Sequence, residues 1–167
     1  KVHDPLIFSV GPLNGYFPYV SKTAVILESD GVLEDIYLGG YLSTRIRFAD
    51  LDAIVLLNKS AKETVITLEN ESAVFKEGGV EIGKLGLPGK RSALELREKE
   101  VLLDDYFTES QKILSQKLLE KRVRGLVISG TKSFNLENPK KYEELYKELL
   151  TKTELLNVDK GKIPYLH

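Results

Sequence analysis

The sequence predicts a single α+β domain spanning residues 1–167, with strands concentrated in its first half and helices in its second. Three observations support this fold class: apolar runs closed by turn residues up to residue 77, a glycine-rich stretch at 78–89, and a helical apolar stripe near the C-terminus. Because strands and helices are segregated instead of alternating, we expect an α+β arrangement and not a parallel sheet built from βαβ units.

The strands of the first half are short apolar runs. They are expected at Pro5–Val10, Lys22–Ser29, Val32–Leu38, Asp52–Asn58, Glu63–Glu69 and Ser72–Glu77. The run at Asp52–Asn58 is apolar throughout, which is typical of a strand covered on both faces. The last two runs flank Asn70–Glu71 and predict a hairpin. Five glycines and a proline then fill residues 78–89, which predicts a flexible loop or a boundary between two small lobes.

The pattern beyond the glycine-rich stretch becomes helical, and we expect residues 90–122 to form a helical insertion or replacement. The residues Thr108–Gln111 form a capping-box signature, and Ile113, Leu114 and Leu118 continue an apolar stripe. A strand is expected again at Arg124–Gly130.

The last predicted helix has the clearest signals in the chain. Asn138 suits the N-cap and Pro139 the first helical position. An apolar stripe of helical spacing follows, made of Tyr142, Leu145, Tyr146, Leu149 and Leu150. We interpret Tyr142 and Tyr146 as core residues and not as a stacking platform for bases.

The composition excludes several classes of function. Lys plus Arg number 24 against 25 for Asp plus Glu, and the densest basic segment, "EKRVRG", is interpreted as a solvated helix end, so nucleic acid is not an expected partner. Cysteine is absent, which excludes an iron–sulfur cluster or a zinc–thiolate site held by this chain alone. No apolar run is long enough to cross a bilayer and no signal peptide is visible, so we expect a cytoplasmic protein. The abundance of Lys and Glu, without Met or Trp, fits a thermophilic source.

The pair Gly39–Gly40 admits two interpretations. The glycines either supply unusual dihedral angles at a turn, or open a helix whose free amides face an anion. Spacing alone favours the turn. Arg45 and Arg47, further along the same segment, could flank an anion, although a solvated rim is the simpler role.

Several segments together resemble the N-terminal domain of the tungsten-containing aldehyde ferredoxin oxidoreductases. These are "DPLIFSVGPLNGYFPYVSKTAVILES", "GGYLSTRIRFADLDAIVL", "NKSAKETVITLENESAVFKE" and, near the end, "RVRGLVISGTKSFNLENPKKYEEL". The resemblance implies two stacked β-sheets with flanking helices, forming a base for a bis-pterin tungsten cofactor with a bridging magnesium. It also implies that Gly11, Gly39 and Gly40 keep family positions, with the double glycine at a helix start near the pterin phosphates.

The chain departs from the family pattern at charged and polar positions. Lys22 occurs where the family has a phosphate-binding arginine, and it lacks the bidentate fork of that side chain. Tyr37 replaces an asparagine that ligates the magnesium, and Glu28 replaces a lysine, so we expect its charge to repel a phosphate. The segment "SQKILSQKLLEKRVRG" replaces an arginine- and glycine-rich one that closes over the second pterin. The family's catalytic domains and cluster cysteines are expected outside this chain.

Other candidate groups are weaker. His3 and His167 lie near the two termini with no third histidine to complete a metal site, so no metal ligand or catalytic residue is assigned. Asp104–Asp105 and Glu143–Glu144 are sequence neighbours, and neighbours on a helix diverge too far to act as a carboxylate pair.

Three functional hypotheses follow. The chain is a divergent, non-catalytic descendant of the family domain that binds a ligand or protein, or it is the tungstopterin-binding subunit of a split oxidoreductase. A generic anion- or nucleotide-binding module ranks last. In the first two cases we expect a homo-oligomer or a partner chain to cover the former cofactor face.

Overall fold

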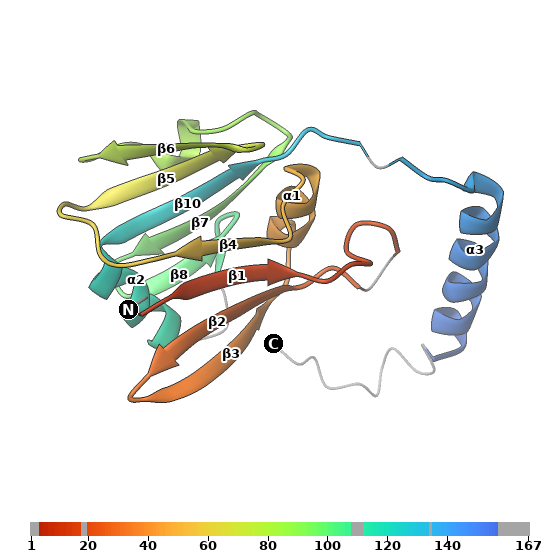
Figure 1. The fold of residues 1–167 in the computed structure, drawn as a ribbon, viewed down its shortest axis with the longest axis horizontal. Coiled ribbons are helices and arrows are strands. Elements are labelled where there is room, and N and C mark those ends of the chain that lie inside the picture. Colours follow the sequence, from red (N-terminus) through yellow and green to blue (C-terminus); the bar gives the residue numbers. More distant parts are fainter. Residues whose placement is uncertain (1–3, 18–19, 108–111, 134, 157–167) are drawn as a thin grey trace.

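The computed structural model describes residues 4–17, 20–107, 112–133 and 135–156, and these form two stacked β-sheets with helices at their ends (Figure 1). One sheet has four strands in the order β3-β2-β1-β4, and the other has six in the order β6-β5-β10-β7-β8-β9. The strands are β1 (Leu6–Val10), β2 (Thr23–Ser29), β3 (Val32–Leu38), β4 (Ala53–Leu56), β5 (Thr64–Glu69), β6 (Ser72–Glu77), β7 (Arg91–Arg97), β8 (Glu100–Leu103), β9 (Tyr106–Phe107) and β10 (Val123–Ser129). The helices are α1 (Leu42–Phe48), α2 (Lys112–Lys121) and α3 (Pro139–Leu156), with a 3-10 turn η1 (Ile82–Lys84). The predicted α+β class and the two stacked sheets are confirmed.

One hydrophobic core fills the space between the sheets. Alternate residues of each strand point inward, as in Leu6 and Phe8 of β1 and Leu94 and Leu96 of β7. Each fully buried side chain of this size contributes about 1.5–3 kcal/mol relative to exposure. Helices α1 and α2 lie at opposite ends of the sandwich, and both contact strands of both sheets. The helices therefore close the two ends of the core.

Strand β10 is the centre of the larger sheet. It pairs parallel with β5 and antiparallel with β7, and residues Gly125 to Ser129 are buried without a break. This strand is covered on both faces, since the smaller sheet lies on one side and the glycine-rich segment on the other. The prediction of a strand at Arg124–Gly130 is confirmed.

The glycine-rich segment is packed against the outer face of the larger sheet, so the prediction of a lobe boundary at 78–89 is wrong. Ile82 is 4% exposed and packs on Val65 and Val127. Gly86 has φ +76°, and a Cβ there would lie 2.6 Å from the Ser129 hydroxyl oxygen. The glycines thus allow close contact with the sheet as well as turning the chain.

The prediction of a helical segment at 90–122 is wrong for its first part, which forms β7, β8 and β9. Ser92, Leu94 and Leu96 alternate with less buried residues, a strand period interrupted by charges that obscured it in the sequence. The helix α2 begins only at Lys112, and its Leu114 and Leu118 are buried as expected. The predicted capping box at 108–111 lies outside the described residues.

The prediction that the run at Asp52–Asn58 is covered on both faces is also wrong. Strand β4 lies at the edge of the smaller sheet, where Ile54 is 8% exposed but Val55 is 49% exposed. Only its inner face is covered by the described residues, so the apolar run did not indicate burial on both faces.

Helix α3 stands beside the sandwich instead of within it (Figure 1). The Asn138 side chain accepts a hydrogen bond from the Lys141 amide at 3.0 Å, which confirms the predicted N-cap. Tyr142 and Tyr146 are only partly buried, with ring centroids 5.4 and 6.5 Å from that of Phe17. Their assignment to the core was wrong, because α3 packs on the turn that follows β1. No helix in the described part of the chain is long and apolar enough to span a membrane.

Candidate functional site

Three of the four predicted site residues meet at one end of the smaller sheet. Val10, Thr23 and Leu38 face one another across β1, β2 and β3. Gly11 follows the first of these residues, Lys22 precedes the second and Gly39 follows the third. Since neighbouring strands lie about 4.8 Å apart, the three positions form one contiguous surface.

The double glycine connects β3 to α1, whose N-cap residue is Tyr41. Gly40 has φ +73°, and a Cβ there would lie 3.1 Å from a methyl carbon of Leu103. Gly39 faces open space, with no heavy atom within 4 Å of a built Cβ. The turn and the helix start are therefore both present. Gly40 makes the turn, and Gly39 leaves its backbone accessible two residues before the N-cap of α1.

Asn14 is a buried neighbour of this surface that the sequence analysis did not identify. It is fully buried, and its side-chain amide donates a hydrogen bond of 2.7 Å to the Ser43 carbonyl in the first turn of α1. Its own amide closes a turn with the Gly11 carbonyl at 3.1 Å. The sequence "NG" indicated only a turn, although the side chain ties the loop after β1 to the start of α1.

Two departures from the family pattern have different positions. Tyr37 lies on β3 close to Gly39 and is 60% exposed, and its hydrogen bond with Asp35 raises the pKa of the phenol above its ordinary value. Glu28 lies at the opposite end of β2, paired with Leu33, roughly 20 Å from Lys22 at the usual rise per residue. Glu28 therefore lies far from the surface of Gly11, Lys22 and Gly39, and its predicted repulsion of a phosphate does not act at that surface.

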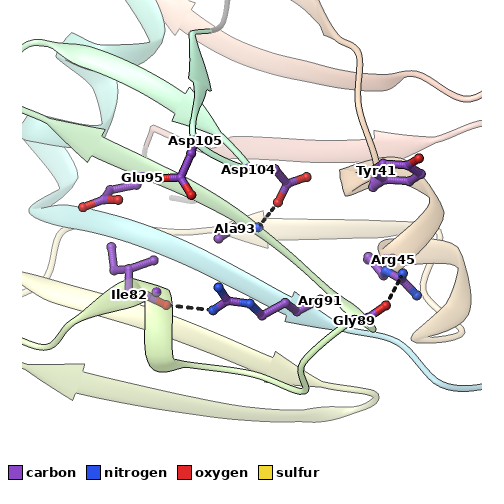
Figure 2. Close-up of a pocket in the computed structure, with 10 residues that line it drawn as sticks. Tyr41, Arg45, Ile82, Gly89, Arg91, Ala93, Glu95, Asp104 and Asp105 are labelled. Carbon is purple, nitrogen blue, oxygen red and sulfur yellow. Dashed lines mark hydrogen bonds between the residues drawn. The ribbon is translucent and has the colours of Figure 1, made fainter.

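A polar cavity of about 520 Å³ lies beside α1 on the outer side of the larger sheet (Figure 2). Figure 2 shows the side chains of α1, the glycine-rich segment, β7 and the β8–β9 turn around it. Its charged lining residues are Arg45, Arg91, Glu95, Asp104 and Asp105. The mixture of both signs makes the cavity polar without giving it a strong net charge.

Most charged groups of this cavity form hydrogen bonds with the segments that surround it. Arg45 donates to the Gly89 carbonyl at 3.0 Å, and Arg91 donates to the carbonyls of Ile82 and Leu85. Asp104 accepts hydrogen bonds from the Ser92 hydroxyl and the Ala93 amide, both at 2.8 Å.

Neither Arg45 with Arg47 nor Asp104 with Asp105 forms a shared site. Arg47 pairs with Asp52 at 2.7 Å while Arg45 reaches the glycine-rich segment, so the two arginines do not flank one anion. Asp104 and Asp105 occupy a turn and have different partners, since Asp105 lies 3.4 Å from Arg97. They do not act as a carboxylate pair, although the reason is the turn and not a helix.

The opposite end of the sandwich is closed by buried charges. Lys117 pairs with Asp4 at 2.7 Å, and Lys121, whose side chain is 2% exposed, pairs with the same carboxylate at 3.3 Å. Lys121 also donates to the carbonyls of Asp4 and Asn58. The hydrogen bond from Lys117 lowers the pKa of Asp4 against the opposing effect of burial, and Lys121 lowers it further. The interpretation of this basic segment as a solvated helix end is wrong for Lys121.

The described residues contain no group of three or more His, Cys, Asp or Glu that could hold a metal ion. His3 and His167 lie outside the described residues.

The family assignment follows from a sequence match that spans both sheets and the surface at the end of the smaller sheet. The family model described as the aldehyde ferredoxin oxidoreductase N-terminal domain matches residues 2–129, which is more than half of the chain. The chain belongs to this family. The matched range includes both sheets and the surface formed by Gly11, Lys22 and Gly39. None of the curated proteins matches the sequence.

A solved structure shares the fold of this aldehyde ferredoxin oxidoreductase N-terminal domain. It is described as the active site complex BamBC of benzoyl coenzyme A reductase in complex with 1,5-dienoyl-CoA. The match has a TM-score of 0.74 with 16% sequence identity, and it covers 96% of this chain. This chain spans 28% of the length of the matching chain. At this identity the likeness establishes the fold alone.

Proposed function

We propose that this chain is a divergent aldehyde ferredoxin oxidoreductase N-terminal domain that acts in the cytoplasm as a ligand- or protein-binding module and has no catalytic activity alone. The proposal rests on a contrast between backbone and side chains at the end of the smaller sheet. The backbone surface of Gly11, Gly39 and Gly40 is kept, while the side chains that would bind a charged cofactor are changed.

The residues at this surface fit a tungstopterin with its phosphates and magnesium poorly. Such a cofactor would supply two-electron redox chemistry when bound, and here the Gly39 backbone and the Lys22 ammonium would hold its phosphate. Lys22 offers a point charge without a bidentate fork. Tyr37 offers a protonated phenol, hydrogen-bonded to Asp35, where a hard cation prefers a carbonyl or carboxylate oxygen.

A second candidate is the tungstopterin-binding subunit of a split oxidoreductase. The retained backbone surface of Gly11, Gly39 and Gly40 favours it. In either case a partner chain or a second copy would cover the former cofactor face. Tyr37 and Tyr41 support this inference, because they are 60% and 68% exposed beside the double glycine.

Metal and pterin analysis distinguishes the two candidates. Protein purified from tungstate-supplied cells is assayed for tungsten, molybdenum and, after denaturation, pterin fluorescence. We expect far less than one equivalent of each in well-folded protein. One equivalent of metal with pterin would overturn the proposed binding module and would support the tungstopterin-binding subunit.

Matched variants test whether Tyr37 and Lys22 are the reason for the low expected pterin content. The double variant Tyr37→Asn and Lys22→Arg restores the family pattern, and we expect it to raise pterin content. Glu28→Gln, at the far end of β2, is the control and should change nothing. Equal gains in both variants would show that the surface near Gly39 is not responsible.

A further inference from the structure

We propose that the free edge of β4, together with the overhanging β6, is a self-association surface on which a second copy of this chain docks. Its β4 would run antiparallel to the first, so that the two smaller sheets join into one sheet of eight strands, four from each copy. This surface is at the opposite edge of the smaller sheet from β3, which carries Tyr37 beside the former cofactor face.

The unequal size of the two layers creates the surface. The smaller sheet ends at β4, whereas the larger sheet continues to β6. Phe75 of β6 pairs in register with Ile66, a core residue, so it lies on the inner face of its sheet. It is nevertheless 67% exposed, since the smaller sheet has no strand opposite it among the described residues. A strand added to β4 would lie beneath Phe75.

A groove of about 280 Å³ already occupies this position. Val55 and Leu57 line it from the β4 side, Ile66 lines its floor, and Phe75 lines it from β6. Val55 and Leu57 are each 49% exposed. The groove is thus bordered by apolar side chains on both layers, as expected for a surface that is covered in the assembled protein.

The edge of β4 lacks the protection that other edges carry. Exposed edge strands are usually guarded against pairing by charged residues or proline. The edge strand β3 contains Glu34 and Asp35, and β6 contains Lys76 and Glu77. Strand β4 reads Ala-Ile-Val-Leu and is followed by Leu57, with no charge and no proline. An unguarded edge of this kind favours strand addition.

The charges around β4 favour a second copy over a different partner. The strand has an acidic start at Asp52, whose carboxylate pairs with Arg47 yet is 84% exposed, and a basic end at Lys59. Antiparallel pairing of two β4 strands brings the start of each near the end of the other, so opposite charges approach at both ends. Pairing centred on Val55 also places Ile54 opposite Leu56, both on the core side, which preserves the alternation of faces. A two-fold axis through Val55 therefore brings opposite charges together at both strand ends and also keeps the core-facing residues on one face.

Sedimentation of the full chain over a range of concentrations tests the proposal. We expect a dimer of twice 18.8 kDa that dissociates on dilution. Val55→Lys should weaken the dimer at least tenfold, because it places two like charges together on the axis. Leu33→Lys is the matched control, since it is also an exposed residue on an edge strand of the same sheet, and it should leave the dimer unchanged.

Cross-linking gives a second readout that does not depend on affinity. The chain has no cysteine, so Val55→Cys introduces a single thiol. Directly opposed residues of an antiparallel pair have Cβ atoms close enough for a disulfide, and we expect oxidation to yield a covalent dimer. Leu33→Cys should remain monomeric on the gel.

A monomer at all concentrations without cross-linking, or a dimer broken by Leu33→Lys and not by Val55→Lys, would overturn the proposal. The second outcome would instead favour association through the edge of β3.

Discussion

The two ends of the sandwich are each closed by a helix, yet they are built from different chemistry. At the α2 end, Lys117 and Lys121 point inward and share the Asp4 carboxylate. At the α1 end, Gly39 leaves backbone open to solvent, and closure depends on the buried Asn14 and on close packing at Gly130. The difference indicates that the α2 end serves stability, whereas the α1 end combines closure with an accessible surface.

The largest effect is expected at Gly130, where the last residues of β10 pass under α1. A Cβ at this position would lie 2.4 Å from the Arg45 carbonyl oxygen and 2.5 Å from the Ala49 nitrogen. We expect Gly130→Ala to lower the free energy of unfolding by about 3 kcal/mol, measured by urea denaturation, since backbone atoms must move. Gly83→Ala, with no neighbour within 4 Å, is the control. Equal stability of the two variants would contradict the packing at the α1 end.

The next effect concerns the buried cation of the α2 end. Lys121→Met keeps the aliphatic stem but leaves the Asn58 carbonyl and part of the Asp4 carboxylate without a donor. Because the Asp4 side chain is 43% exposed and can be hydrated, we expect a loss of about 2 kcal/mol, less than for a fully buried pair. Lys112→Met on the exposed side of the same helix should be nearly neutral. A loss no larger than that of the control would show that the buried pair does not stabilise this end.

The two adjacent glycines of the α1 end should differ from each other. Gly40→Ala meets Leu103 and a positive φ, so we expect a loss of about 1 kcal/mol in the free energy of unfolding. Gly39→Ala faces open space, and its thermal midpoint should match that of the wild type. A larger loss at Gly39 would show that its backbone is constrained by the fold and is not a free surface.

The smallest effect is a pH dependence at the α2 end. Pairing with Lys117 and Lys121 holds the folded-state pKa of Asp4 below its ordinary value of 3.8. Its contribution to stability is therefore present above that ordinary value and is lost as the pH falls through the lower, folded pKa. Asp4→Asn removes this titration. We therefore expect the stability difference between wild type and variant to shrink between about pH 5 and pH 3. A constant difference over this range would show that pairing with the lysines does not lower the pKa of the Asp4 carboxyl group.

Local signals in the sequence were sufficient for several elements. The strands β1, β2 and β3, the β5–β6 hairpin and the N-cap of α3 all occur where turn residues and apolar periods predicted them. The resemblance carried by the glycine segments predicted the stacked sheets. The period of β7 was present but obscured, because Glu95 and Arg97 alternate with leucines in a segment flanked by further charges.

The candidate site was predicted less completely. Gly11, Lys22 and Gly39 were named from the resemblance, and strand pairing brings them together. Asn14 was missed because a buried side chain in a turn cannot be told from an exposed one by local pattern. The distance of Glu28 from this surface was not predicted, since it depends on which way β2 runs past Gly39.

The sequence by itself determined where the strands β1, β2, β3, β5 and β6 and the helix α3 begin, because turn formation, capping and apolar period depend on residues only a few positions apart. The tertiary structure alone decided which charges are buried and which apolar residues are exposed. Lys121 is buried because Asp4, from the other end of the chain, lies beside it. Val55 is exposed because it lies on the outer face of β4, which no described element covers, whereas Ile54 on the inner face of the same strand is buried.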